Sequence, residues 1–117
     1  MADFDNTGSF RQRLEAFWPY YLGEHSRRIT RLWHFAGSTL GLVCLLAFFI
    51  DQKWWLIPLG LVLGYGFAWI GHFFFEKNRP ATFKYPLLSF LSDWRMFYCI
   101  LTGRISRELD RFDIREK

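Results

Sequence analysis

The chain has 117 residues, of which 51% are hydrophobic and 21% aromatic, and its formal net charge is +4. This length fits one domain, and an apolar share above the usual range of roughly 45–50% excludes a disordered or fibrous chain. The mean hydropathy is close to zero, but charged ends flank two segments, residues 33–50 and 54–75, that contain no Asp, Glu, Lys or Arg.

The first expected element is an amphipathic helix over residues 10–22. Its apolar residues recur at helical spacing, namely Phe10, Leu14, Phe17, Trp18 and Tyr21. Polar residues occupy the other side, a pattern typical of a helix lying in the membrane interface.

The two uncharged segments follow, and each is close to the ~20 apolar residues that cross a bilayer as a helix. Only Asp51, Gln52 and Lys53 connect them, which predicts a tight helical hairpin. We therefore expect an all-α membrane protein: a two-span transmembrane helical hairpin, 33–50 and 54–75, with flanking amphipathic interfacial helices in a single membrane domain, 1–117.

The second flanking helix is expected over residues 87–102. It has an apolar stripe, but Asp93 and Arg95 lie at its middle, and a charge at the bilayer centre costs ~2.5–3.5 kcal/mol on insertion scales. An interfacial helix is therefore favoured over a third span. Residues 104–117 are expected to form a charged, exposed tail.

Basic residues flank the hairpin on one side: Arg27, Arg28 and Arg31 precede the first span, and Lys77, Arg79 and Lys84 follow the second. By the positive-inside rule, we expect both termini to be cytoplasmic. The location would be the inner membrane in a bacterium or the endoplasmic reticulum in a eukaryote. The same rule accounts for the basic charge without a nucleic-acid partner, and the sequence leaves a homo-oligomer open.

Folding the hairpin about Gln52 makes small residues level with one another: Gly41 with Gly64, Gly37 with Ala68, and His34 with Gly71 or His72. Small residues at such spacings let membrane helices approach closely. The predicted seam thus ends at its cytoplasmic edge in two histidines.

Glu76 stands one turn beyond His72, whereas His25 can join His34 only if the helix breaks between them. Imidazoles and a carboxylate together suit a first-row metal such as iron, and a 2-His-1-carboxylate set is a known design for oxygen activation at Fe(II). A histidine at the end of a span more often hydrogen-bonds a carbonyl or a headgroup. Glu76 could equally be an ion-pair partner.

Two motifs resemble a known family: Tyr21-xxx-His25-xxxxxxxx-His34-xx-Gly37 and Gly71-His72-xx-Phe75-Glu76-xxx-Pro80-Ala81. They are similar to the membrane family of 2-hydroxy fatty acid dioxygenases, typified by a yeast endoplasmic-reticulum protein, over roughly residues 18–103, and closest to its short bacterial branch. The resemblance implies Fe(II)-dependent α-oxidation, in which a 2-hydroxy long-chain fatty acid reacts with O2 and loses one carbon. It also implies that His25, His34 and His72 are iron ligands, with Glu76 as a further candidate.

In this hypothesis the fatty chain lies in the bilayer beside the hairpin, and Arg28, Arg79 or Lys84 neutralises its carboxylate. Two other function classes fit the same residues. One is a haem or electron-transfer hairpin with His34 and His72 as axial ligands. The other is a non-enzymatic membrane anchor or partner subunit, in which the glycine seam serves only for packing.

Overall fold

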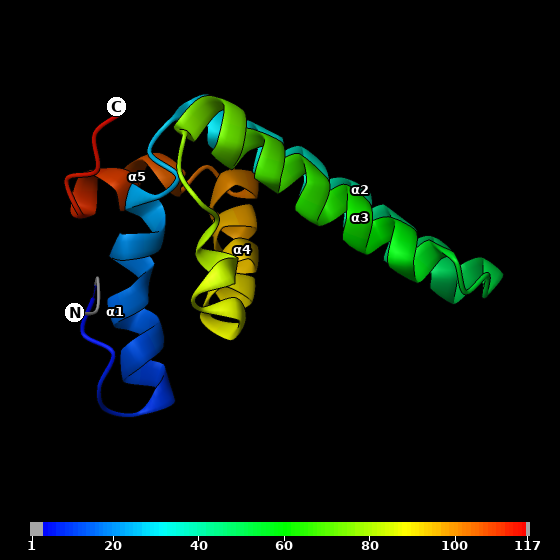
Figure 1. The fold of residues 1–117 in the computed structure, drawn as a ribbon, viewed down its shortest axis with the longest axis horizontal. Coiled ribbons are helices and arrows are strands. Elements are labelled where there is room, and N and C mark those ends of the chain that lie inside the picture. Colours follow the sequence, from blue (N-terminus) through cyan, green and yellow to red (C-terminus); the bar gives the residue numbers. More distant parts are fainter. Residues whose placement is uncertain (1–3, 117) are drawn as a thin grey trace. The chain divides into compact units, whose positions relative to one another are not determined.

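The structure, a computed structural model that describes residues 4–116, contains helices and no strands within that range. This confirms the all-α fold class. The elements in chain order are α1 (Phe10–Gly23), α2 (Arg28–Asp51), α3 (Leu56–Ile70), the π-helix η1 (Gly71–Glu76), the 3-10 turn η2 (Ala81–Phe83), α4 (Pro86–Leu101) and α5 (Ile105–Arg111) (Figure 1).

The chain forms two compact units. The hairpin unit is Arg27–Lys77, and the terminal unit comprises the described parts of Met1–Ser26 and Asn78–Lys117. The terminal unit therefore combines segments from both ends of the chain, and the hairpin unit is the segment between them in the sequence.

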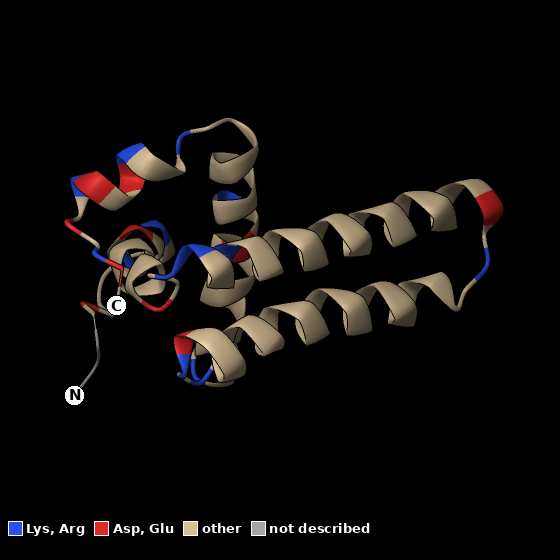
Figure 2. Ribbon diagram, turned by 90° about the horizontal axis from the view of Figure 1, so that it is seen from above, with Lys and Arg blue, Asp and Glu red and all other residues tan. Residues whose placement is uncertain are grey.

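In the hairpin unit, α2 runs out and α3 with η1 returns beside it. Arg28–Asp51 has 24 residues and Leu56–Glu76 has 21, and both are long and apolar enough to cross a membrane. Their Lys, Arg, Asp and Glu residues lie at the two ends of the hairpin, with none between (Figure 2). At the turn, Gln52 adopts a left-handed conformation (φ 53°) that ends α2.

Glycines bring the two helices into close contact along one face. A Cβ atom added at Gly37 would lie 2.8 Å from the Gly64 carbonyl oxygen, and one added at Gly41 would lie 3.2 Å from the Gly60 oxygen. The predicted small-residue seam is thus present. Its predicted partners are wrong by one turn, because Gly41 faces Gly60 instead of Gly64 and Gly37 faces Gly64 instead of Ala68.

The terminal unit has an aromatic core. Ser9 caps α1 because its hydroxyl oxygen accepts a hydrogen bond from the Gln12 backbone N–H, and the Gln12 side-chain oxygen in turn accepts one from the Ser9 backbone N–H. The buried core residues of this unit are Phe17, Trp18, Tyr21, Leu22, Ala81, Leu88, Met96 and Cys99. The two flanking helices, expected at 10–22 and 87–102, are found at Phe10–Gly23 and Pro86–Leu101.

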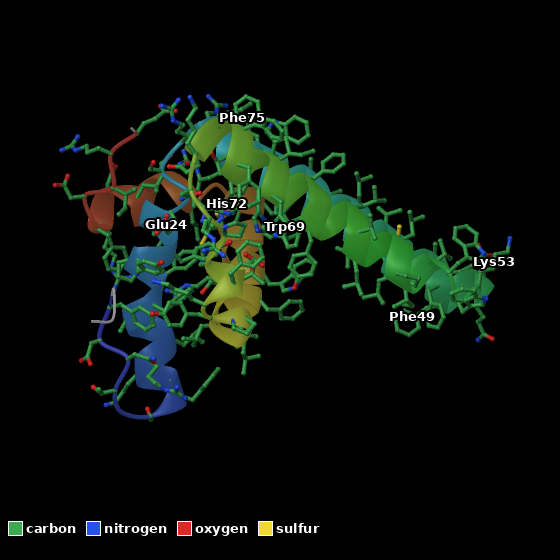
Figure 3. The ribbon with its side chains drawn as sticks, in the orientation of Figure 1. Glu24, Phe49, Lys53, Trp69, His72 and Phe75 are labelled. Carbon is green, nitrogen blue, oxygen red and sulfur yellow. The ribbon has the colours of Figure 1, made fainter. Side chains whose placement is uncertain are left out.

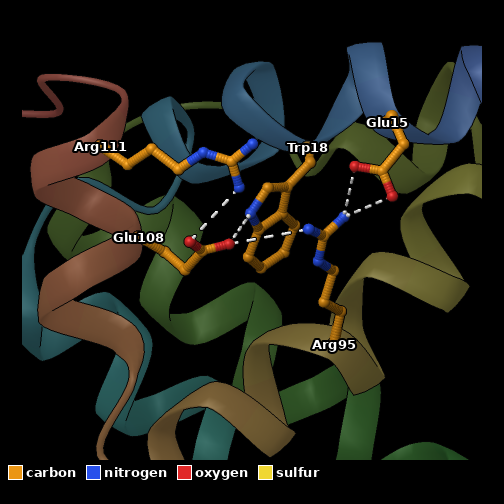
Figure 4. Close-up of polar contacts among 5 residues, drawn as sticks. All are labelled: Glu15, Trp18, Arg95, Glu108 and Arg111. Carbon is orange, nitrogen blue, oxygen red and sulfur yellow. Dashed lines mark hydrogen bonds and ion pairs between the residues drawn. The ribbon is translucent and has the colours of Figure 1, made fainter.

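The charged C-terminal segment is part of this unit. It contains α5, and Ile105, Leu109 and Phe112 pack against the aromatic core. Trp18 is the centre of a polar cluster here: its Nε1 donates to Glu108 Oε1 over 3.0 Å, and the Arg95 guanidinium lies 4.3 Å from its ring centroid (Figure 4). Arg95 also pairs with Glu15 at 3.4 Å and with Glu108 at 3.6 Å.

Candidate functional site

The open end of the hairpin is shaped by the π-helix η1. A π-helix accommodates an additional residue per turn, is rare, and is frequently found at functional sites. Here Gly71, His72 and Glu76 are all buried, while Phe73 and Phe74 are exposed. Gly71 permits the approach of α2, since a Cβ atom there would lie 3.2 Å from the Thr30 carbonyl oxygen. His72 lies near this end of the hairpin, and Phe49 and Lys53 lie at the other end (Figure 3).

Glu76 joins the end of η1 to the beginning of α2. Its side chain is 6% exposed, and its Oε1 accepts hydrogen bonds from the Arg27 backbone N–H (2.9 Å) and from the Thr30 hydroxyl (2.8 Å). Arg27 is the N-cap residue of α2 and has no side-chain cap of its own. The carboxylate thus supplies the acceptor that the helix N-terminus lacks, where a negative charge is also favoured by the helix dipole.

His34 and His72 are both buried on the seam, with 5% and 3% of their surfaces exposed. The observed pairing of Gly37 with Gly64 and of Gly71 with Thr30 places His72 five residues, roughly 7.5 Å, nearer to the open end than His34. Side chains lean toward the N-terminus of their own helix. In this antiparallel pair the His34 side chain therefore leans toward the open end and the His72 side chain toward the turn, which reduces their offset. Ser38 Oγ lies 3.4 Å from His34 Nδ1.

His25 belongs to the terminal unit, where its ring orientation is fixed by two contacts. Its ring stacks on Tyr21 with centroids 4.2 Å apart, and its Nδ1 lies 2.9 Å from the Tyr21 carbonyl oxygen. Because a carbonyl only accepts, Nδ1 carries the proton in the neutral ring and Nε2 carries the lone pair. Donation from one ring nitrogen to a backbone carbonyl is the usual arrangement for a metal-binding histidine.

Tyr21 is itself held by α4. Its hydroxyl donates to Asp93 Oδ1 over 2.6 Å. Burial, together with the negative charge of Asp93 and this hydrogen bond, raises the pKa of Tyr21 well above its ordinary value of 10.0. The phenol that supports the His25 ring is therefore neutral at physiological pH.

The metal donors expected from the sequence are divided between the units: His34, His72 and Glu76 lie in the hairpin unit and His25 in the terminal unit. In the part of the chain that the structure describes, no group of three or more His, Cys, Asp or Glu side chains is placed to hold a metal ion. The donor types fit ferrous iron, which takes imidazole nitrogen and carboxylate oxygen.

The three basic residues expected to neutralise a substrate carboxylate are all exposed. Arg28 begins α2 in the hairpin unit. Arg79 and Lys84 belong to the terminal unit, on either side of η2, and the Arg79 guanidinium lies 5.3 Å from the Phe83 ring centroid.

Comparison with known families bears on the assignment of His25, His34 and His72 as metal donors. The model of the family described as 2-hydroxy-palmitic acid dioxygenase Mpo1-like matches residues 11–105. The chain belongs to the Mpo1-like family. This confirms the family resemblance found in the sequence motifs, and the Mpo1-like match includes His25, His34, His72 and Glu76. No curated protein and no solved structure matches the chain.

Sequence reasoning did not identify two contacts of this Mpo1-like protein. One is the bond of Thr30 to Glu76, although Thr30 precedes His34 by one helical turn and so falls on the same face. The other is the bond of Tyr21 to Asp93, which joins residues 72 positions apart. No local spacing indicates such a pair.

Proposed function

We propose that this protein is a membrane-embedded, iron-dependent dioxygenase that shortens 2-hydroxy long-chain fatty acids by one carbon. The observation that supports the proposal is the match to the 2-hydroxy-palmitic acid dioxygenase Mpo1-like family over residues 11–105. The family name indicates the substrate class, a fatty acid that carries a hydroxyl next to its carboxylate.

The hairpin unit would cross the bilayer, with both termini in the cytoplasm. Two observations support this arrangement: both helices reach membrane-spanning length, and the Arg and Lys residues gather at the open end, whereas the turn carries only Asp51 and Lys53. A fatty acyl chain would then lie beside the hairpin, with its polar end at the open end of the hairpin.

We propose His34, His72 and His25 as the ligands of the iron. Two features support this assignment: the burial of His34 and His72 on one seam, and the tautomer of His25, which leaves Nε2 as its ligating nitrogen. Bound ferrous iron would supply the activation of O2 that this oxidation requires. Glu76 is either a fourth ligand or the group that positions the N-terminus of α2 beside His34.

The remaining task of the chain is to bind the substrate carboxylate. Arg28, Arg79 and Lys84 are exposed cations, and a guanidinium can hold a carboxylate through two parallel hydrogen bonds. We propose that one or more of these three residues neutralises the carboxylate.

The test is to purify the full chain under reducing, chelator-free conditions and measure its iron content and its O2-dependent turnover of 2-hydroxypalmitic acid. His34→Ala and His72→Ala should each lose both iron and turnover, because removing one ligand of three greatly weakens a non-haem site. Gly66→Ala is the control, since a Cβ atom at Gly66 meets nothing within 4 Å. Full iron and full turnover in both histidine variants would eliminate His34 and His72 as the iron ligands, whereas a parent chain without iron and without turnover would favour a membrane anchor.

Glu76→Gln separates the two roles of that carboxylate. A lost ligand should remove the iron, whereas a lost supporting contact should weaken iron binding by ~10–100-fold. The absorption spectrum of the same preparations tests the haem alternative, since a Soret band that disappears in His34→Ala and His72→Ala would assign these residues to haem instead.

A further inference from the structure

Helix α4 has an unusual distribution of side chains. Its buried face includes two serines, Ser89 and Ser92, each 1% exposed. Its outward face is formed instead by large apolar and aromatic residues that are 36–64% exposed: Leu87, Phe90, Leu91, Trp94, Tyr98 and Leu101. A water-facing helix shows the reverse pattern, with polar residues outward. We name these six residues the α4 outer face.

The charged residues of α4 are turned away from this face. Asp93 accepts the hydrogen bond of the Tyr21 hydroxyl, and Arg95 lies over the Trp18 ring and pairs with Glu15. The α4 outer face therefore contains no carboxylate, and its exposed surface is apolar along the full length of the helix.

Cations are found at both ends of the α4 outer face. Arg79 and Lys84 precede the helix, and Arg104 follows it with its guanidinium 5.7 Å from the Tyr98 ring centroid. An apolar and aromatic stripe with basic residues beside it is typical of a helix that inserts into an anionic lipid surface. Because the cations are at both ends of a helix about 24 Å long, both ends would lie at the level of the headgroups.

We propose that the α4 outer face binds the surface of an anionic bilayer, with α4 lying in the plane of the membrane. Its Leu, Phe and Trp side chains would enter the upper acyl region, and Lys84 and Arg104 would contact lipid phosphates. The terminal unit would then be a second membrane-bound part of the chain, in addition to the hairpin unit. This proposal does not depend on iron, on the substrate or on dioxygenase activity.

The experiment uses the full chain reconstituted in vesicles of phosphatidylcholine and phosphatidylglycerol. An environment-sensitive fluorophore is attached to Leu87→Cys or Leu101→Cys, one at each end of the α4 outer face. The exposed Ser106→Cys on α5 is the matched control, and the unsubstituted chain reports any labelling of the buried Cys44 and Cys99. Lipids brominated near the headgroup and aqueous iodide serve as opposing quenchers.

Both α4 labels should be quenched several-fold more by shallow brominated lipid than the Ser106→Cys label, and several-fold less by iodide. Iodide quenching equal to that of the control would overturn the proposal, because the face would then be in water. Protection from both quenchers would overturn it too, because a protein surface would then cover the helix. Equal shallow depth at the two labels supports the in-plane orientation, and one deep label would contradict it.

The charge contribution is tested separately with Lys84→Gln and Arg104→Gln combined. In phosphatidylglycerol vesicles this variant should increase the iodide quenching of the Leu101→Cys label, and high salt should have the same effect on the parent chain. Arg115→Gln, at an exposed position in the C-terminal segment, should leave the label unchanged. An equal effect of both variants would show that the cations beside α4 have no specific role in lipid binding.

Discussion

The carboxylate of Glu76 accepts a hydrogen bond of 2.8 Å from the hydroxyl of Thr30, and both side chains are buried. The two residues are 46 positions apart in the sequence. The bond joins the end of η1 to the first turn of α2, directly beside the two histidines of the seam.

Thr30→Val is expected to destabilise the hairpin, because the buried Glu76 carboxylate loses a hydrogen-bond donor. A hydrogen bond to a charged group contributes ~1.5–3 kcal/mol. The amide of Arg27, which donates to the same oxygen, should exchange with solvent faster, as measured by hydrogen–deuterium exchange. Thr30→Ser retains the hydroxyl and should keep the protection found in the parent chain. Unchanged exchange in Thr30→Val would show that this bond does not hold the helix end.

Gly37→Ala is expected to separate α2 from α3. The added Cβ atom would lie 2.7 Å from the Phe67 Cβ and 2.8 Å from a backbone oxygen, and overpacking of this kind costs ~1–3 kcal/mol. Gly66→Ala, with open space around the new atom, should be neutral or stabilising because alanine is the better helix former. The midpoint of unfolding in detergent micelles measures the difference. Equal midpoints for both variants would contradict the observed seam.

The helices themselves were predictable, because a period of 3.6 residues and the absence of charge over 33–50 and 54–75 are local properties of the sequence. The face of the seam was predictable for the same reason. Its register was not, because it depends on the conformation of the turn: the contacts of Gly37 with Gly64 and of Gly41 with Gly60 are centred between residues 50 and 51, so Gln52 is not the pivot. An error of a few residues at the pivot changes every glycine partner by one turn.

The candidate site was predictable only in part. His34 and His72 follow from spacing along the seam, and the resemblance to the family added His25. The π-helix over Gly71–Glu76 has no signature in composition, since a single additional residue in a turn leaves the local pattern almost unchanged. The packing of α5 against the aromatic core was also hidden, because Ile105, Leu109 and Phe112 are dispersed among charged residues.

Glu108→Ala is expected to destabilise the terminal unit. The buried Trp18 indole N–H would lose its acceptor, and an unsatisfied buried donor costs ~1–3 kcal/mol. Trp18 fluorescence changes should accompany a lower unfolding midpoint. Asp110→Ala, on the same helix but exposed, is the control and should stay within ~0.5 kcal/mol of the parent chain. A Glu108→Ala variant as stable as this control would show that the cluster in Figure 4 contributes little.

Topology gives a direct test of membrane insertion. Cysteine labels at positions 5 and 110 should both react from the cytoplasmic side, and a label at Gln52 should react from the opposite side, because positive charge gathers at the open end of the hairpin. Membrane-impermeant reagents applied to sealed vesicles measure this. Termini found on different sides would mean that α4 crosses the membrane, and both the two-span arrangement and the in-plane α4 would be wrong.

The Tyr21 phenol makes the stability of the terminal unit sensitive to alkaline pH. Burial and the neighbouring Asp93 raise the pKa of Tyr21 above 10.0 in the folded chain, so from about pH 10 upward the unfolded chain has lost a proton that the folded chain retains. Unfolding then releases a proton, and the stability present below pH 10 is lost as the pH rises through the folded-state pKa. The free energy of unfolding should fall by up to ~1.4 kcal/mol per pH unit from this group. Tyr21→Phe should have a shallower slope above pH 10, while the exposed Tyr98→Phe should keep the parent slope. Identical slopes for the parent chain and both variants would show that Tyr21 titrates alike in the folded and unfolded chains.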